Sequence, residues 1–121
     1  MRKRFRVTYV TLKASKNDTH KVLLNPLGAV GQLEGRDPSA KPVWVIWLPA
    51  EKLVEYTGLF AEAKATNQIF VLEAEVARIQ VDDVYHNPET KALSQDLEVK
   101  FADKVTKTVE AKAVAAAPVE W

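Results

Sequence analysis

Alternating apolar and polar side chains predict a strand near the N-terminus. In residues 4–12, Phe5, Val7 and Tyr9 alternate with polar or charged side chains, which is typical of a strand buried on one face. Turn-forming residues follow, and residues 20–24 have the pattern of a second short strand that ends at an Asn-Pro pair. We therefore expect the chain to begin with a β-hairpin.

The middle of the chain predicts a central strand followed by a helix. Residues 41–49 are apolar on both faces and bounded by prolines, as in a strand covered on both sides. Pro49 suits the first turn of a helix, and apolar residues recur at helical spacing through residues 50–65. Prolines and glycines crowd residues 25–42, so we expect a long loop there, with a short strand at residues 29–33.

The strongest strand signal lies in residues 69–81, where apolar side chains first occupy even positions and then odd ones. A period of two allows this change only with an extra residue, so we expect a β-bulge near Ala77. A turn at residues 86–90 leads to a strand at 97–101, and residues 105–111 suit a last edge strand. Bulged, curved strands are typical of small barrels. The fold class expected is mainly β with one α-helix, as a curved antiparallel sheet or a small OB-like barrel.

Length and composition limit the alternatives. With 121 residues, the chain fits one β-rich domain at residues 1–112 and a C-terminal tail at residues 113–121. The absence of cysteine excludes disulfides and thiolate metal sites, and we expect no cofactor. There is neither an apolar run of the roughly 18 residues that cross a bilayer nor a secretory leader pattern, so we expect no membrane contact. A cytoplasmic location, or the virion if the source is viral, follows as an expectation.

Charge is concentrated at the N-terminus, although the net charge is only +1. Arg2, Arg4 and Arg6 alternate on one strand face, with about 6.5 Å between successive side chains. Such a row matches a phosphate backbone, and Lys13 and Lys16 extend it. The alternative is that this basic cluster is simply the solvated end of a strand.

Aromatic side chains near the basic strand suggest base stacking. Tyr9, Trp44 and Trp47 are the candidates, because rings beside cations are used to bind single-stranded nucleic acid. Trp44 and Trp47 differ in parity and therefore point to opposite faces of a regular strand. One of them could be exposed, unless the helix and a second layer bury both.

The sequence gives little support for catalysis or for metal binding. Asp82, Asp83 and His86 are the one closely spaced acid–histidine group, but they match no defined ligand motif and lie beside a turn. The glycine-rich residues 28–35 lack the lysine of a phosphate loop. No serine–histidine–acid set can be placed, so we predict no metal site, no catalytic residues and no enzyme activity.

The C-terminus ends in an acid and an aromatic residue, Glu120 and Trp121, after an alanine-rich spacer. In these last residues it resembles the tails through which some single-stranded-DNA-binding proteins recruit partners, although it lacks their run of aspartates. We therefore predict that Glu120 and Trp121 form a docking segment for a protein partner.

Two functions from different classes follow. The first is non-sequence-specific binding of single-stranded DNA or RNA. Its predicted contacts are Arg2, Arg4, Arg6, Tyr9, Lys13, Lys16, Trp44 and Trp47. The second is a non-enzymatic structural subunit of phage type, a homo-oligomer whose copies join through edge strands and tails.

Overall fold

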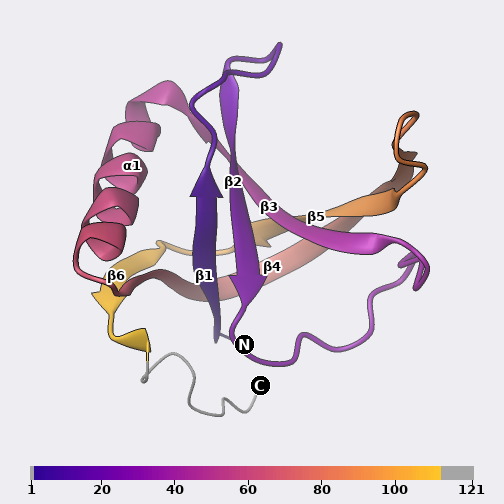
Figure 1. Cartoon of the computed structure of the whole chain (residues 1–121). Coiled ribbons are helices and arrows are strands. Elements are labelled where there is room, and N and C mark those ends of the chain that lie inside the picture. The colour runs from indigo at the N-terminus through magenta and orange to yellow at the C-terminus, as the bar shows by residue number, and fades with distance from the viewer. Residues whose placement is uncertain (1, 113–121) are drawn as a thin grey trace.

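A computed structural model describes residues 2–112, which form six strands and one helix (Figure 1). The elements are β1 (Arg2–Val10), β2 (Thr19–Pro26), β3 (Lys41–Pro49), α1 (Ala50–Ala65), β4 (Ile69–His86), β5 (Leu93–Phe101) and β6 (Thr106–Glu110). The predicted tail, including Glu120 and Trp121, lies outside the described residues. In residues 2–112, no helix combines the length and the apolar character that crossing a membrane requires.

Five strands close into a ring in the order β1-β2-β3-β5-β4, and β4 pairs back onto β1. The pairings are antiparallel except between β3 and β5, which run parallel. A parallel pair needs a long crossover, and α1 and β4 supply it. The prediction of a mainly β, barrel-like fold with one helix is confirmed, with the correction that the sheet is mixed rather than purely antiparallel.

The 18-residue strand β4 holds the ring together. Its first part pairs with β1 on one edge and β6 on the other, and its second part pairs with β5. A register shift between Val76 and Arg78 confirms the bulge expected near Ala77, and a second shift lies between Val81 and Val84. These bulges let one strand bend from the barrel into the long β4–β5 hairpin seen in Figure 1.

A bulge in β1 corrects the predicted face of Tyr9. The register with β2 shifts between Val7 and Tyr9, so Phe5, Val7 and Val10 point into the core. Tyr9 is 54% exposed instead of buried beside Val7. The alternation of residues 4–12 is regular, so it carries no sign of this extra residue.

The core fills the ring with aromatic and branched side chains. The ring of Phe5 packs on Trp44 and Phe101, with centroids 6.1 and 6.0 Å apart. Helix α1 covers one end of the barrel, where Tyr56 packs on Phe70 at 5.7 Å. Gly58 is accommodated within this helix, whose predicted bounds are confirmed.

The long loop between β2 and β3 packs two of its side chains against the core of the barrel. Val30 and Leu33 pack against the core, but no strand forms at residues 29–33, so that prediction is wrong. Gly31 and Gly35 have φ values of +77° and +84°, which L-residues with a side chain rarely adopt and which interrupt any extended run.

Gln95 on β5 ties this loop to the sheet and is 2% exposed. Its amide oxygen accepts hydrogen bonds from the Asp37 backbone N–H at 2.9 Å and the Arg36 guanidinium at 3.1 Å. Its amide nitrogen donates to the carbonyl oxygens of Gly35 and Asp82 at 3.0 and 2.9 Å. A buried amide with all its bonds satisfied fixes the loop in one position.

Candidate nucleic-acid interface on the outer face of the sheet

Trp47 lies on the outer face of the barrel, where β2 and β3 are neighbours. Trp44, Ile46 and Leu48 are buried in the barrel, so Trp47 between them points outward. The Trp47 side chain is 37% exposed, whereas Trp44 is 8% exposed and packs on Phe5. The expectation for Trp44 is corrected: its ring belongs to the core, and Trp47 is the tryptophan available on this face.

Lys21 on β2 bridges across β3 to Asp96 on β5. Its Nζ lies 2.9 Å from Oδ2 of Asp96 and 5.7 Å from the centre of the Trp47 ring. Lys21 is opposite Trp47 in the ladder, and Asp96 is opposite Val43, so the bridge passes over Val45 between them. This arrangement explains why Val45, although on the outer face, is fully buried.

Two predicted contact residues border this face on β1. Tyr9 is opposite Leu23 on β2, and Arg6 is opposite the exposed Asn25. Arg6 is exposed and forms no hydrogen bond or ion pair with any residue in the described range. An unpaired guanidinium and an exposed phenol therefore lie beside the Trp47 strand pair.

Lys13 and Lys16 lie in the exposed loop that joins β1 to β2 at residues 11–18. Because Thr19 pairs with Pro49, this loop lies at the end of β3 that carries Trp47. Neither lysine forms an ion pair with a residue of the described chain. The structure thus brings these two lysines to one border of the face.

Arg2 and Arg4 point away from β2 and are neutralised by acids. Arg2 forms ion pairs with Glu73 at 3.3 Å and Asp103 at 3.1 Å. Arg4 forms ion pairs with Glu73 at 3.3 Å and with Glu110 on β6. The predicted row of three free guanidinium groups is therefore corrected, because only Arg6 keeps its charge unpaired.

Acids mark the opposite border of the face, on β4 and β5. The Gln80 amide donates hydrogen bonds to Asp82 at 3.0 Å and Glu98 at 3.3 Å, which brings the two carboxyl groups together. Contact with the Asp82 carboxyl, and then burial, raise the pKa of Glu98 above its ordinary value. An anionic ligand is disfavoured here, so the cationic part of the face is the part over β1, β2 and β3.

The face is hollowed on both sides of Val43. One depression of about 310 Å³ includes Leu23 and Lys41, and another of about 360 Å³ includes Lys21 and Tyr85. Tyr85, which the sequence analysis missed, is 58% exposed and opposite Ser94. After the first β4 bulge, odd-numbered side chains such as Ile79 and Val81 point into the barrel, which predicts the same for Tyr85. The second bulge turns Tyr85 outward, so the alternation in the sequence alone could not identify it as exposed.

No metal centre is described. Asp82, Asp83 and His86 all lie on β4, and residues 2–112 contain no group of three or more His, Cys, Asp or Glu side chains arranged to hold a metal.

Comparisons with models of protein families, with curated proteins and with solved structures found no match. The case for a function therefore rests on the geometry of this face.

Proposed function

We propose that the protein binds single-stranded nucleic acid across the outer face of β1, β2 and β3, with little sequence preference and without catalysis. The observation that carries the proposal is an exposed Trp47 ring on a hollowed sheet face bordered by unpaired cations. Exposed rings beside cationic side chains are how single-stranded nucleic acid is bound on small β-barrels.

In this mechanism, phosphates lie along the β1 side and the loop of residues 11–18, where Arg6, Lys13 and Lys16 are free to pair with them. Bases stack on Trp47 and Tyr9, since every base offers a flat face to an aromatic ring. Three neutralised phosphates correspond to a slope of about −2 for the logarithm of the binding constant against that of the salt concentration. The acidic β4–β5 border repels the backbone and keeps the strand on this path.

The experiment is a titration with a labelled oligothymidine at several salt concentrations, using fluorescence anisotropy. The triple variant Arg6→Ala/Lys13→Ala/Lys16→Ala should bind weakly and lose most of the salt dependence. A matched triple variant, Lys64→Ala/Lys104→Ala/Lys112→Ala, removes the same charge from exposed positions elsewhere and should bind like the wild type. Equal affinity for both triple variants would overturn the proposal.

A second candidate is a structural subunit of phage type that forms a homo-oligomer. Beyond Glu75, the edge of β4 that faces away from β5 has no strand partner among residues 2–112. Antiparallel pairing of two copies about Gln80 would place Arg78 of each copy opposite Asp82 of the other. For either candidate, we propose a location in the cytoplasm, or in a virion if the source is viral.

Sedimentation analysis distinguishes the two candidates. Under the assembly proposal, Arg78→Asp should shift a dimer to monomer, and adding Asp82→Arg should restore the dimer. A wild-type protein that stays monomeric at all concentrations rules out assembly through this edge.

A further inference from the structure

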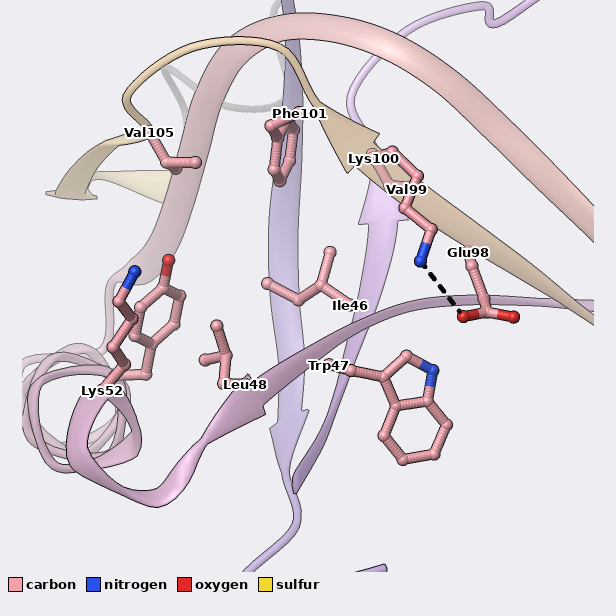
Figure 2. Close-up of a pocket in the computed structure, with 10 residues that line it drawn as sticks. Ile46, Trp47, Leu48, Lys52, Glu98, Val99, Lys100, Phe101 and Val105 are labelled. Carbon is pink, nitrogen blue, oxygen red and sulfur yellow. Dashed lines mark ion pairs between the residues drawn. The ribbon is translucent and has the colours of Figure 1, made fainter. Parts of the chain in front are cut away.

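Another cavity, of about 290 Å³, opens beside Trp47 where β3 and β5 separate. The β3–β5 ladder ends at Val45 and Glu98, because β3 then turns into α1 while β5 continues toward β6. The cavity is lined by residues of β3, α1 and β5, among them Trp47, Lys52, Tyr56, Glu98 and Lys100 (Figure 2). It therefore adjoins the proposed strand path through the Trp47 side chain.

The helix side of this cavity offers a cation and an unused donor. Lys52, in the first turns of α1, is exposed and forms no ion pair with a residue of the described segment. Tyr56 follows one helical turn later and is 5% exposed, yet its hydroxyl forms no hydrogen bond within residues 2–112. Burial, and then the nearby Glu55, raise the pKa of the Tyr56 hydroxyl, so it remains protonated and able to donate. Since the hydroxyl lines the cavity and has no protein partner in the described segment, it is a group to which a ligand can bond.

The opposite side of the cavity is formed by the Lys100–Glu98 ion pair and by the ring of Trp47. Figure 2 shows Lys52 and Lys100 on opposite sides, with the apolar Leu48 and Ile46 between them. Lys100 lies 3.5 Å from Glu98, so this pair contributes little net charge. Lys21 does not line the cavity, which leaves the cavity side of Trp47 free for stacking.

We propose that this cavity holds one nucleotide that carries a terminal phosphate, with the phosphate at Lys52 and Tyr56 and the base against Trp47. The inference rests on the proposed function, because it adds an anchor for a strand end to the strand path on the neighbouring face. A phosphate monoester carries a charge of roughly −1.5 to −2, more than a phosphate inside a strand, and so gains more from Lys52 and the positive end of α1. A volume of about 290 Å³ is at the small end of the range for ligand sites, roughly 300–1,000 Å³, which suits one nucleotide rather than several.

The source of this nucleotide is either the end of a bound strand or a free mononucleotide. The test compares oligothymidines of one length with a phosphate at the 5′ end, at the 3′ end or at neither end, and it includes thymidine monophosphate alone. Binding of strands is followed by fluorescence anisotropy, and binding of the mononucleotide by backbone amide shifts in nuclear magnetic resonance spectra. The variants are Lys52→Met and Tyr56→Phe, with Lys64→Met at the other end of the same helix as the control.

We expect a phosphate at one end to raise the affinity of the wild type about tenfold, as a charge-assisted hydrogen bond typically does. Lys52→Met and Tyr56→Phe should lose this gain while binding the unphosphorylated strand normally, and Lys64→Met should keep it. Normal folding of each variant is checked by its melting temperature.

The outcomes separate the two proposals. If strands bind but neither phosphate raises affinity and the mononucleotide causes no shifts at the cavity, the inference is overturned while the proposed function stands. If no strand binds but the mononucleotide binds in a manner that depends on Lys52, the cavity is a nucleotide site and the proposed function fails.

Discussion

The Lys21 ammonium lies 5.7 Å from the centre of the Trp47 ring, across the β2–β3 ladder. The same ammonium is held 2.9 Å from Asp96. A single lysine therefore connects the ring proposed to stack on bases with the acidic border of the face. The Lys21 charge interacts with both the Trp47 ring and the Asp96 carboxylate, which limits how strongly Lys21 attracts a phosphate.

Replacing Asp96 should strengthen binding. In Asp96→Asn, Lys21 loses its ion-pair partner and the face loses one negative charge, so the affinity for oligothymidine should rise several-fold with a steeper salt dependence. The measurement is a titration at two salt concentrations. Unchanged affinity would mean that the strand does not pass over Lys21.

The two tryptophans on β3 should separate binding from stability. Trp47→Ala removes a stacking ring, which is worth about 1–3 kcal/mol per base, and should weaken oligothymidine binding by roughly tenfold or more. Because Trp47 is partly exposed, its replacement should lower the free energy of unfolding far less than Trp44→Ala does. Trp44→Ala leaves a cavity in the core, at a cost of about 3–5 kcal/mol. Denaturant unfolding and anisotropy titrations together test this contrast. Similar binding by Trp47→Ala and the wild type would exclude stacking on this ring.

The N-terminal arginines should have different roles. Arg6→Ala should lower affinity and reduce the magnitude of the salt slope by about one-half to one unit, since one phosphate contact is lost. Arg4→Ala breaks the contacts with Glu73 and Glu110, and should lower the free energy of unfolding while leaving the salt slope unchanged. Equal salt slopes for Arg6→Ala and the wild type would contradict the proposed strand path.

The ionisation of Glu98 should lower the free energy of unfolding as the pH rises, which is the opposite of the usual effect of a carboxyl group. The Asp82 contact, then burial, raise the pKa of Glu98, so the folded protein binds its proton more tightly than the unfolded chain does. Charged Glu98 is therefore destabilising above its raised pKa, and this penalty disappears as the pH falls below the ordinary value of 4.5. Glu98→Gln should be more stable than the wild type at pH 7 and equally stable at pH 4.

Glu110 provides the control with the opposite sign. The hydrogen bond from Arg4 holds the pKa of Glu110 below its ordinary value of 4.5. Its contribution to stability is present above that value and is lost as the pH falls through the lowered pKa. Glu110→Gln should be less stable than the wild type at pH 7, and the difference should shrink in acid. If both variants change stability in the same direction at pH 7, the assigned pKa shifts are wrong.

The buried Gln95 amide should control the 27–40 loop. Gln95→Leu removes four hydrogen bonds and leaves the Asp37 N–H and the Gly35 and Asp82 carbonyls without this partner. We expect a loss of about 2–4 kcal/mol in the free energy of unfolding and faster hydrogen exchange at Asp37. Exchange rates equal to the wild type would show that the loop is held by its apolar contacts.

The elements and the β4 curvature could be predicted because they depend on local patterns. The alternation through Phe70, Leu72 and Ala74 correctly identified core positions, and the phase change located the bulge near Ala77. Tyr9 was assigned to the wrong face because its bulge lies in a stretch that alternates regularly in the sequence. The register of a strand depends on its partner as well as on its own residues.

The candidate site was less predictable because it depends on contacts between distant residues. Arg2 and Arg4 look free in the sequence, and only the β1–β4 and β4–β6 pairings bring Glu73 and Glu110 to them. Gln95 lies in an ordinary strand pattern, and nothing in the sequence links it to a loop some 60 positions away. Arg6, Lys13 and Lys16 remain predictions that the proposed titration tests.

Closure of the ring also determines when the protein can fold during synthesis. Arg2 meets Glu73 across the β1–β4 seam, 71 positions later in the chain. A ribosome therefore releases β1, β2 and β3 well before the strand that completes the barrel has been made. During that interval Phe5, Val22 and Trp44 have no closed interior to occupy, and the nascent chain is most vulnerable to aggregation between the synthesis of β3 and the end of β5, the strand that joins β3 to β4 in the ring.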